Sequence, residues 1–440
     1  MRIHRVTAVA LALAVGLSVV GLTAGSAGAQ STPDFSKLKR VKAPSPCKND
    51  PGISSSQITV VGILPQSGPT APSFADSANG MKARLELANA NGELGDRKIK
   101  FIVEDDAGQA GRNVTAAQKA VEEDNAFGIL ENSLVADASA KYLNQKGVPV
   151  VGWHLGLAAF GIYPNFFGWR NSFPPDAGKN TFTTLNGDYL KTKGVHRIAL
   201  VGANTSNSAL FIENNAGAIK YGGGKGMKVV YKTTSVTVDQ RDFTAEAQKI
   251  KDAKADALVT GMDFLQDTAL SAAVAQLGYK LKVTLFPAAE DTRILQLPGI
   301  EGAYFGTEVV PFELNPPSYQ EYKAAMQKYA PGTFLDGEVP YIGWLSADTF
   351  IKGLTEAGVA CPTRKAFITN LRLVKDWTAN GAFNPVDFVK AFAQPLFCAY
   401  FVQVVNAKFV PQLGGKPFCA TKEVRNGKVT KLTAAKIQNA

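Results

Sequence analysis

Four side chains of this 440-residue sequence could together form a nucleophilic centre. Ser133 and His154 each follow an apolar run typical of a buried strand, and Asp263 or Glu290 could orient the histidine. A serine activated by an oriented histidine is the arrangement that many acyl-transfer enzymes use. However, no G-x-S-x-G turn surrounds the serine, and the sequence has neither a G-x-x-x-x-G-K-[ST] loop nor an H-E-x-x-H helix. The sequence therefore predicts a protein that is not an enzyme, with a secreted hydrolase that uses Ser133 and His154 as an alternative.

One acidic cluster and the small number of histidines bear on metal binding. Glu104, Asp105 and Asp106 end an apolar run and could hold a cation, although such trios more often face solvent or cap the next helix. Only 3 histidines occur, and His4 lies in the leader. The sequence therefore predicts no metal ion and no cofactor.

The elements that would position these residues form two series, in which short apolar runs alternate with amphipathic stretches. The first series predicts strands at 58–64, 98–103, 126–130 and 148–151, and helices at 79–91, 112–124 and 135–145. The second predicts strands at 197–201, 228–234, 257–260 and 282–286, and helices at 176–191, 209–220, 243–253 and 266–277. Later helices end at Tyr329 or cover 342–357 and 363–373, and a hairpin joins strands 398–405 and 408–411.

Continuous apolar strands that alternate with helices indicate parallel sheets covered on both faces. The predicted fold class is α/β, with two doubly wound parallel-sheet lobes joined by a multi-crossover hinge. Residues 167–175 contain two prolines and suit a crossover between the lobes. The expected divisions are a signal peptide at 1–29, a flexible basic lead-in at 30–55, lobe 1 at 56–173 plus 312–375, lobe 2 at 174–311 plus 376–420, and a basic tail at 421–440.

The positive charge lies at the two ends of the chain. The net charge is +10, of which residues 1–29 carry +2, residues 30–50 carry +3 and residues 401–440 carry +6, whereas residues 51–400 sum to −1. Basic ends on a neutral body favour contact with an acidic wall or membrane surface. They do not indicate nucleic-acid binding, which needs positive charge on the folded face.

The first 29 residues have the parts of a signal peptide, and export bears on the cysteines. Arg2 and Arg5 precede an apolar stretch to about residue 25, and Ala-Gly-Ala at 27–29 fits a cleavage site. A retained membrane anchor is the alternative. Export permits disulfides, and the four cysteines allow three pairings. We expect Cys361–Cys398 and Cys47–Cys419.

Several segments resemble a known family. Residues 58–69 (ITVVGILPQSGP) are similar to the opening of substrate-binding proteins of ABC transporters of the branched-chain amino-acid (Leu/Ile/Val-binding) type. The strand at 98–106 that ends in E-D-D, residues 147–151 (GVPVV) and residues 341–345 (YIGWL) extend the resemblance to about 57–412. The resemblance implies the type I periplasmic-binding-protein fold, in which two lobes joined by three crossovers close on a small ligand.

The resemblance also implies a ligand site, with departures from the family's pattern. Phe74 would pack on the ligand, and Ser133 with helix N-terminal amides would hold a carboxylate. Glu290 would receive an ammonium group. The remaining implied positions are the altered loop residues His154 and Gly156, the second-lobe positions Asn207 and Asp263, where the family has aromatics, and a possible wall at Tyr341. Structural roles stay open for several of these residues, such as helix capping by Ser133 and Asp263 and core packing by Phe74.

The resemblance thus implies an exported solute-binding protein that captures a small polar metabolite for ABC-transporter uptake. The ligand would be an amino acid, an amide or a small carboxylate, and the partners would be membrane permease subunits. We expect a monomer that is extracellular, cell-wall-associated or periplasmic. Cys47 follows Ala-Pro-Ser-Pro and lies in no lipobox, so a free or electrostatically retained protein is expected. An extracellular ligand sensor on the same fold is the main alternative.

Overall fold

The computed structural model describes residues 33–48, 50–74, 76–154, 156–169, 181–287 and 290–438. The signal peptide expected at 1–29 lies outside these ranges. Among the described residues, no helix combines the length and the apolar composition that crossing a bilayer requires.

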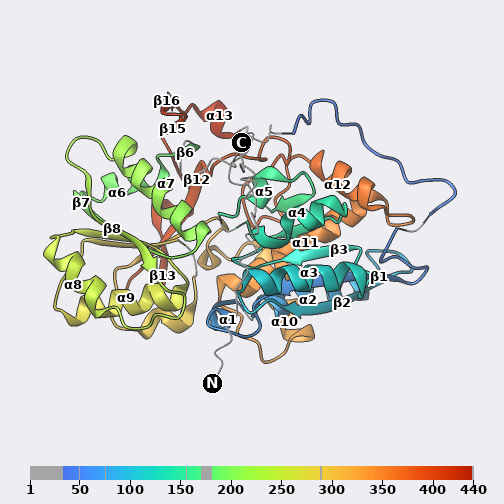
Figure 1. Ribbon diagram of the computed structural model, residues 1–440, viewed down its shortest axis with the longest axis horizontal. Coiled ribbons are helices and arrows are strands. Elements are labelled where there is room, and N and C mark those ends of the chain that lie inside the picture. Colours follow the sequence, from blue (N-terminus) through green and yellow to red (C-terminus); the bar gives the residue numbers. More distant parts are fainter. Residues whose placement is uncertain are drawn as a thin grey trace, which may run out of the picture. The chain divides into compact units, whose positions relative to one another are not determined.

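Lobe 1 is built on a five-stranded parallel sheet of order β2-β1-β3-β4-β5 (Figure 1). Its strands are β1 (Gln57–Leu64), β2 (Lys98–Asp105), β3 (Gly128–Glu131), β4 (Val150–Gly152) and β5 (Phe166–Gly168). Val60 packs in a core with α2 (Asp76–Asn91), α10 (Pro317–Tyr329), α11 (Glu338–Ala357) and α12 (Arg364–Arg372). The next residue, Val61, packs on the opposite face with α3 (Ala110–Glu122), α4 (Asp137–Gln145) and α5 (Ala159–Ile162). Burial on both faces explains why this strand is a continuous apolar run.

Lobe 2 is built on a second sheet of order β13-β12-β11-β10-β9-β7-β8, with β14 (Phe418–Cys419) paired to β12. Its strands are β7 (Arg197–Ala203), β8 (Lys228–Val236), β9 (Ala257–Gly261), β10 (Val283–Phe286), β11 (Tyr304–Thr307), β12 (Cys398–Val404) and β13 (Phe409–Pro411). One face packs against α6 (Leu185–Thr192) and α7 (Ser206–Gly222), and the other against α8 (Thr244–Asp252) and α9 (Phe264–Gln276). The two lobes confirm the predicted fold class, and β12 and β13 form the predicted hairpin.

The chain passes between the two sheets three times, after β5, after β11 and before β12. The first passage includes residues 170–180, which lie outside the described ranges. Lobe 1 also extends past the boundary expected at residue 375, because Phe383 and Phe388 are buried in its core.

The C-terminal residues form structure instead of a separate tail. They contribute β15 (Lys422–Arg425), β16 (Lys428–Lys431) and α13 (Ala434–Gln438), and β15 pairs with β6 (Thr181–Thr183). The helix predicted at 176–191 is therefore wrong at 181–183, where the backbone bonds to a strand some 240 residues later, and the observed helix α6 begins at Leu185. Local periodicity cannot show such a distant pairing.

Both expected disulfide pairings are wrong. The bridges are Cys47–Cys361 and Cys398–Cys419. Cys398 and Cys419 lie opposite each other on antiparallel β12 and β14, with Cα atoms 4.0 Å apart. The lead-in instead lies on lobe 1, where Val41 and Asn370 exchange two hydrogen bonds and Asp50 accepts from the backbone of Arg364. This position brings Cys47 to Cys361, which follows α11.

We expect mass spectrometry of non-reduced peptides to recover these two bridges. Removing the long-range bridge with Cys47→Ser and Cys361→Ser should lower the free energy of unfolding by about 2–4 kcal/mol, because the unfolded chain gains freedom. Urea unfolding measures the loss. Recovery of a Cys361–Cys398 peptide would contradict the structure.

Candidate functional site

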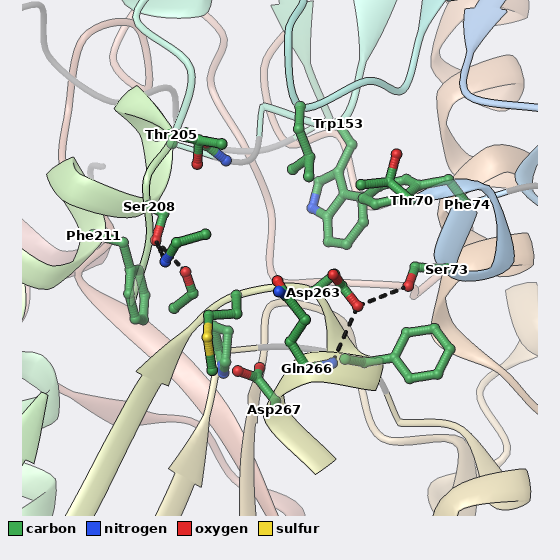
Figure 2. Close-up of a pocket in the computed structure, with 18 of the residues that line it drawn as sticks. Thr70, Ser73, Phe74, Trp153, Thr205, Ser208, Phe211, Asp263, Gln266 and Asp267 are labelled. Carbon is green, nitrogen blue, oxygen red and sulfur yellow. Dashed lines mark hydrogen bonds between the residues drawn. The ribbon is translucent and has the colours of Figure 1, made fainter. Parts of the chain in front are cut away.

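A cavity of about 160 Å³ lies between lobe 1 and lobe 2. Figure 2 shows side chains from both lobes around it: Thr70, Ser73, Phe74 and Trp153 from lobe 1, and Thr205, Ser208, Phe211, Asp263, Gln266 and Asp267 from lobe 2. A cavity of about 150 Å³ can hold a benzene molecule. The space therefore suits a small organic ligand.

The carboxyl ends of parallel strands supply this lining. Thr70 and Ser73 lie after β1, at or next to the short helix α1 (Ala71–Phe74), and Trp153 directly follows β4. Thr205 follows β7, and Asp263 follows β9. Ligands of doubly wound sheets bind at this edge, because the loops and helix N-termini meet there.

Asp263 joins the two lobes. Its Oδ1 accepts hydrogen bonds from the backbone amides of Leu265 and Gln266 at 3.0 and 3.2 Å, which caps α9. The same oxygen accepts from the hydroxyl of Ser73 in lobe 1 at 3.3 Å (Figure 2). Both side chains are buried. A second contact runs from the guanidinium of Arg241 to the carbonyl of Pro69, at 3.2 Å. The lobes are therefore held together at the mouth of α9.

The charged groups of the lining are acidic. They include the carboxyl groups of Asp263, Asp267, Glu308 and Glu338, and no lysine or arginine is among the described lining residues. Glu308 lies 2.9 Å from the Nε2 of His154. Glu338 accepts a hydrogen bond from Thr307 at 2.8 Å. The cavity wall thus favours ligand groups that donate hydrogen bonds or carry positive charge.

Asp267 is the least compensated of these acids. It is 2% exposed, and no well-formed hydrogen bond reaches either carboxyl oxygen, although the Thr260 hydroxyl and the Met262 backbone lie close enough to lower its pKa in part. Burial raises the pKa of Asp267 well above its ordinary value, and the neighbouring charge of Asp263 raises that pKa further. The second oxygen of Asp263 also lacks a partner, and burial likewise raises the pKa of Asp263. Such costly groups in a cavity wall are typical of a functional site.

Aromatic rings form part of the lobe 1 wall. The ring centroids of Phe74 and Trp153 lie 6.0 Å apart, and those of His154 and Trp169 also lie 6.0 Å apart. Across the cavity, lobe 2 contributes Phe211. A ligand could therefore place an apolar or cationic part against aromatic faces.

Five of the eight residues implied by the resemblance lie in the cavity lining. They are Phe74, His154, Gly156, Asn207 and Asp263. The capping role left open for Asp263 is also observed, so one side chain both caps α9 and lines the cavity.

The other three lie elsewhere. The hydroxyl of Ser133 accepts from the backbone amide of Val135 at 3.3 Å, and only the next residue, Leu134, lines the cavity. Tyr341 is fully buried in the core of lobe 1, with its hydroxyl 2.5 Å from that of Ser318. Glu290 is buried in a smaller recess, also lined by Arg293, that shares Ser73, Phe264, Glu338 and Val339 with the cavity. These positions place the expected carboxylate seat and ammonium partner outside the lining.

Several lining residues escaped the sequence reading. Ser73, Phe211 and Asp267 belong to no motif, and their roles depend on the approach of the two lobes. One usable signal exists for Asp267, which lies four residues after Asp263 and so falls on the same helix face.

The comparisons with known proteins agree with this geometry. Residues 57–408 match the family model described as periplasmic binding protein. The chain belongs to this family. This membership confirms the resemblance predicted from the sequence. It is a family of binding proteins and gives no support to the hydrolase alternative. No curated protein sequence is similar enough to this chain to count as a match.

Solved structures share the fold at low sequence identity. A branched-chain amino-acid ABC transporter protein from Thermus thermophilus with bound valine has a TM-score of 0.73 and 16% identity, over 84% of this chain and 98% of that one. A fatty-acid ABC transporter substrate-binding protein from Thermomonospora curvata has a TM-score of 0.70 and 17% identity, over 86% of this chain and 97% of that one. A solute-binding protein of an ABC transporter from R. palustris, in complex with benzoate, has a TM-score of 0.66 and 18% identity, over 83% of this chain and 98% of that one.

Replacing Asp267 by asparagine should stabilise the ligand-free protein at neutral pH. A carboxyl whose pKa is raised on folding costs no stability below the unfolded pKa of about 3.9, and the cost grows as pH rises through the folded pKa. Urea unfolding between pH 4 and 8 should therefore show a gain for Asp267→Asn that increases with pH.

The exposed Asp96 provides the matched control. Its Asp96→Asn variant should stay within about 0.5 kcal/mol of the parent. Equal stability of the Asp267→Asn variant and the parent at every pH would contradict the account of a costly buried carboxyl.

Proposed function

We propose that this protein is an exported solute-binding protein that captures a small polar metabolite between its lobes for uptake by an ABC transporter. The observation that carries the proposal is a cavity lined by both lobes, which the hydrogen bond between Ser73 and Asp263 joins. Family membership supports binding as the general role. The compounds named for the similar structures, valine, benzoate and fatty acid, support a small organic ligand.

The two-sided lining supports a mechanism of closure. Trp153 and Phe74 would contact a ligand from lobe 1, whereas Asp267 and Ser208 would contact it from lobe 2. All of these contacts form together only when the lobes are closed. A ligand would therefore shift the equilibrium toward the closed form, because it binds that form better. Permease subunits would then recognise the closed form.

The chemistry of the lining narrows the ligand class. Acceptor atoms without a well-formed hydrogen bond, including both oxygens of Asp267 and one of Asp263, favour hydrogen-bond donors on the ligand. The described lining offers no lysine or arginine to neutralise a carboxylate. Among the expected classes, the site therefore favours amides over small carboxylates, and its acidic lining adds amines to the candidates. The apolar parts of such a ligand would lie against Phe74 and Trp153.

Export and partners belong to the same proposal. Cleavage after Ala29 would release a monomer without a lipid anchor, and the basic segments at 30–50 and 401–440 would retain it near an acidic wall or membrane surface. Part of the C-terminal charge is compensated, because Arg425 and Lys436 both pair with the buried Glu423.

A thermal-shift screen with amino acids, amides, amines and small carboxylates tests the function. A ligand at a hundredfold its Kd should add about 2.7 kcal/mol to the free energy of unfolding. Asp267→Asn should then weaken the best binder about 10- to 100-fold, because a hydrogen bond to a charged group contributes about 1.5–3 kcal/mol.

The Asp96→Asn control should leave the affinity unchanged. A screen in which no compound raises the melting temperature, or a best binder that is indifferent to Asp267→Asn, would contradict the proposed site.

Ser73→Ala tests the contact between the lobes. Loss of the hydroxyl removes the hydrogen bond to Asp263 that links the two lobes. We expect about tenfold weaker binding in calorimetry, mainly through faster release, with the free protein folded as before. Unchanged affinity would show that closure does not depend on this contact.

A further inference from the structure

A second cavity of about 120 Å³ adjoins the first. The two share five lining residues: Phe211, Asn214, Pro287, Gly306 and Glu308. The first two belong to α7, and the other three lie at the carboxyl ends of β10 and β11. The boundary between the two cavities, called the partition here, is therefore formed by one face of α7 opposite the ends of β10 and β11.

The far wall of the second cavity is mostly apolar. It includes Leu185 of α6, Ala218 of α7, Leu285 of β10 and Ala399 of β12, all of them buried. Its amides of Asn186 and Asn215 bond to each other at 2.8 Å. This end of the space therefore suits a hydrocarbon or aromatic group and offers little to a second charge.

Gly306 leaves room in the partition. It lies on β11, between Tyr304 and Glu308 on the strand face that packs against α6 and α7. A Cβ built there would lie 3.4 Å from the ring of Phe401 and 3.9 Å from the carbonyl of Phe286, which are ordinary contacts. Packing therefore does not require a glycine at position 306. Because Gly306 has no side chain, nothing at this position blocks the passage between the two cavities.

We propose that one ligand occupies both cavities. Its hydrogen-bond-donating head lies at the Asp263–Asp267 end, and its apolar chain passes Gly306 toward Ala218 and Leu285. The ligand class is therefore a small amphiphile with a cationic or donor head and a hydrocarbon tail. This inference rests on the proposed function and adds the direction and chemistry of the tail.

The alkylammonium series from ethyl- to octylammonium tests the inference by calorimetry. For the unaltered protein, affinity should rise about fourfold for each methylene that enters the second cavity. Ala218→Met fills the far end of that cavity only. It should leave ethylammonium binding within about twofold and weaken octylammonium at least tenfold.

Two further variants complete the experiment. Gly306→Val narrows the partition and should weaken the long members far more than the short ones, which keeps the test valid if Ala218→Met fails to fold. Thr284→Val adds a valine on the neighbouring strand β10, outside both linings, and should change no affinity.

The outcomes separate this inference from the proposed function. Three results would overturn the two-cavity ligand. The first is an affinity that does not rise with chain length, and the second is an equal loss for short and long members in both cavity variants. The third is no ammonium binding by a protein that binds another compound. A protein that binds neither this series nor any compound of the thermal-shift screen overturns the proposed function as well.

Discussion

The site depends on the hydrogen bonds that the carboxyl group of Asp263 accepts. It satisfies the first amides of α9, so it is required for the end of that helix, and it receives the Ser73 hydroxyl from the other lobe. A helix N-terminus has unpaired N–H groups and a positive end, so the amides of Leu265 and Gln266 offset part of the burial that raises the pKa of Asp263. Asp263 thus caps a helix, lines the cavity and joins the two lobes.

The groups around this contact are costly to bury. Neither Asp267 nor the fully buried Glu290 has a well-formed hydrogen bond at a carboxyl oxygen. The contacts of Asp267 with Thr260 and Met262, and of Glu290 with the backbone of Phe312, lower their pKa values only in part. Burial raises the pKa of Glu290 well above its ordinary value, and the nearby Glu313 and Glu338 raise it further. The backbone of Glu290 also bonds to that of Glu338, at 2.7 Å, where two crossing segments meet. Incompletely compensated carboxyl groups should lower stability around the cavity, which is expected where ligand binding is required.

The sequence predicted the regular part of the fold well, because that part follows local rules. The run at 58–64 became β1 (Gln57–Leu64), and the Asn406-Ala407 turn joins β12 and β13 as expected, with both residues at positive φ. What failed depends on distant segments. The pairing of β6 with β15 and the bridge between Cys47 and Cys361 join residues more than 200 positions apart, which no local pattern reports.

The site was predictable to the extent that it uses strand ends. Phe74, His154 and Asp263 follow the first, fourth and later strands, and the topology brings them to one edge. Ser133 and Tyr341 did not join them, because the local backbone and the lobe 1 core use their hydroxyl groups. Ser73 and Asp267 gain their roles only from the approach of the second lobe.

Closure of the two lobes on a ligand is the central claim, and small-angle X-ray scattering tests it most directly. The protein would be measured free and with the compound that gives the largest thermal shift. The account predicts a smaller radius of gyration with the compound and no such change for a compound that does not bind. An identical radius of gyration for the free and the saturated protein would contradict ligand-driven closure.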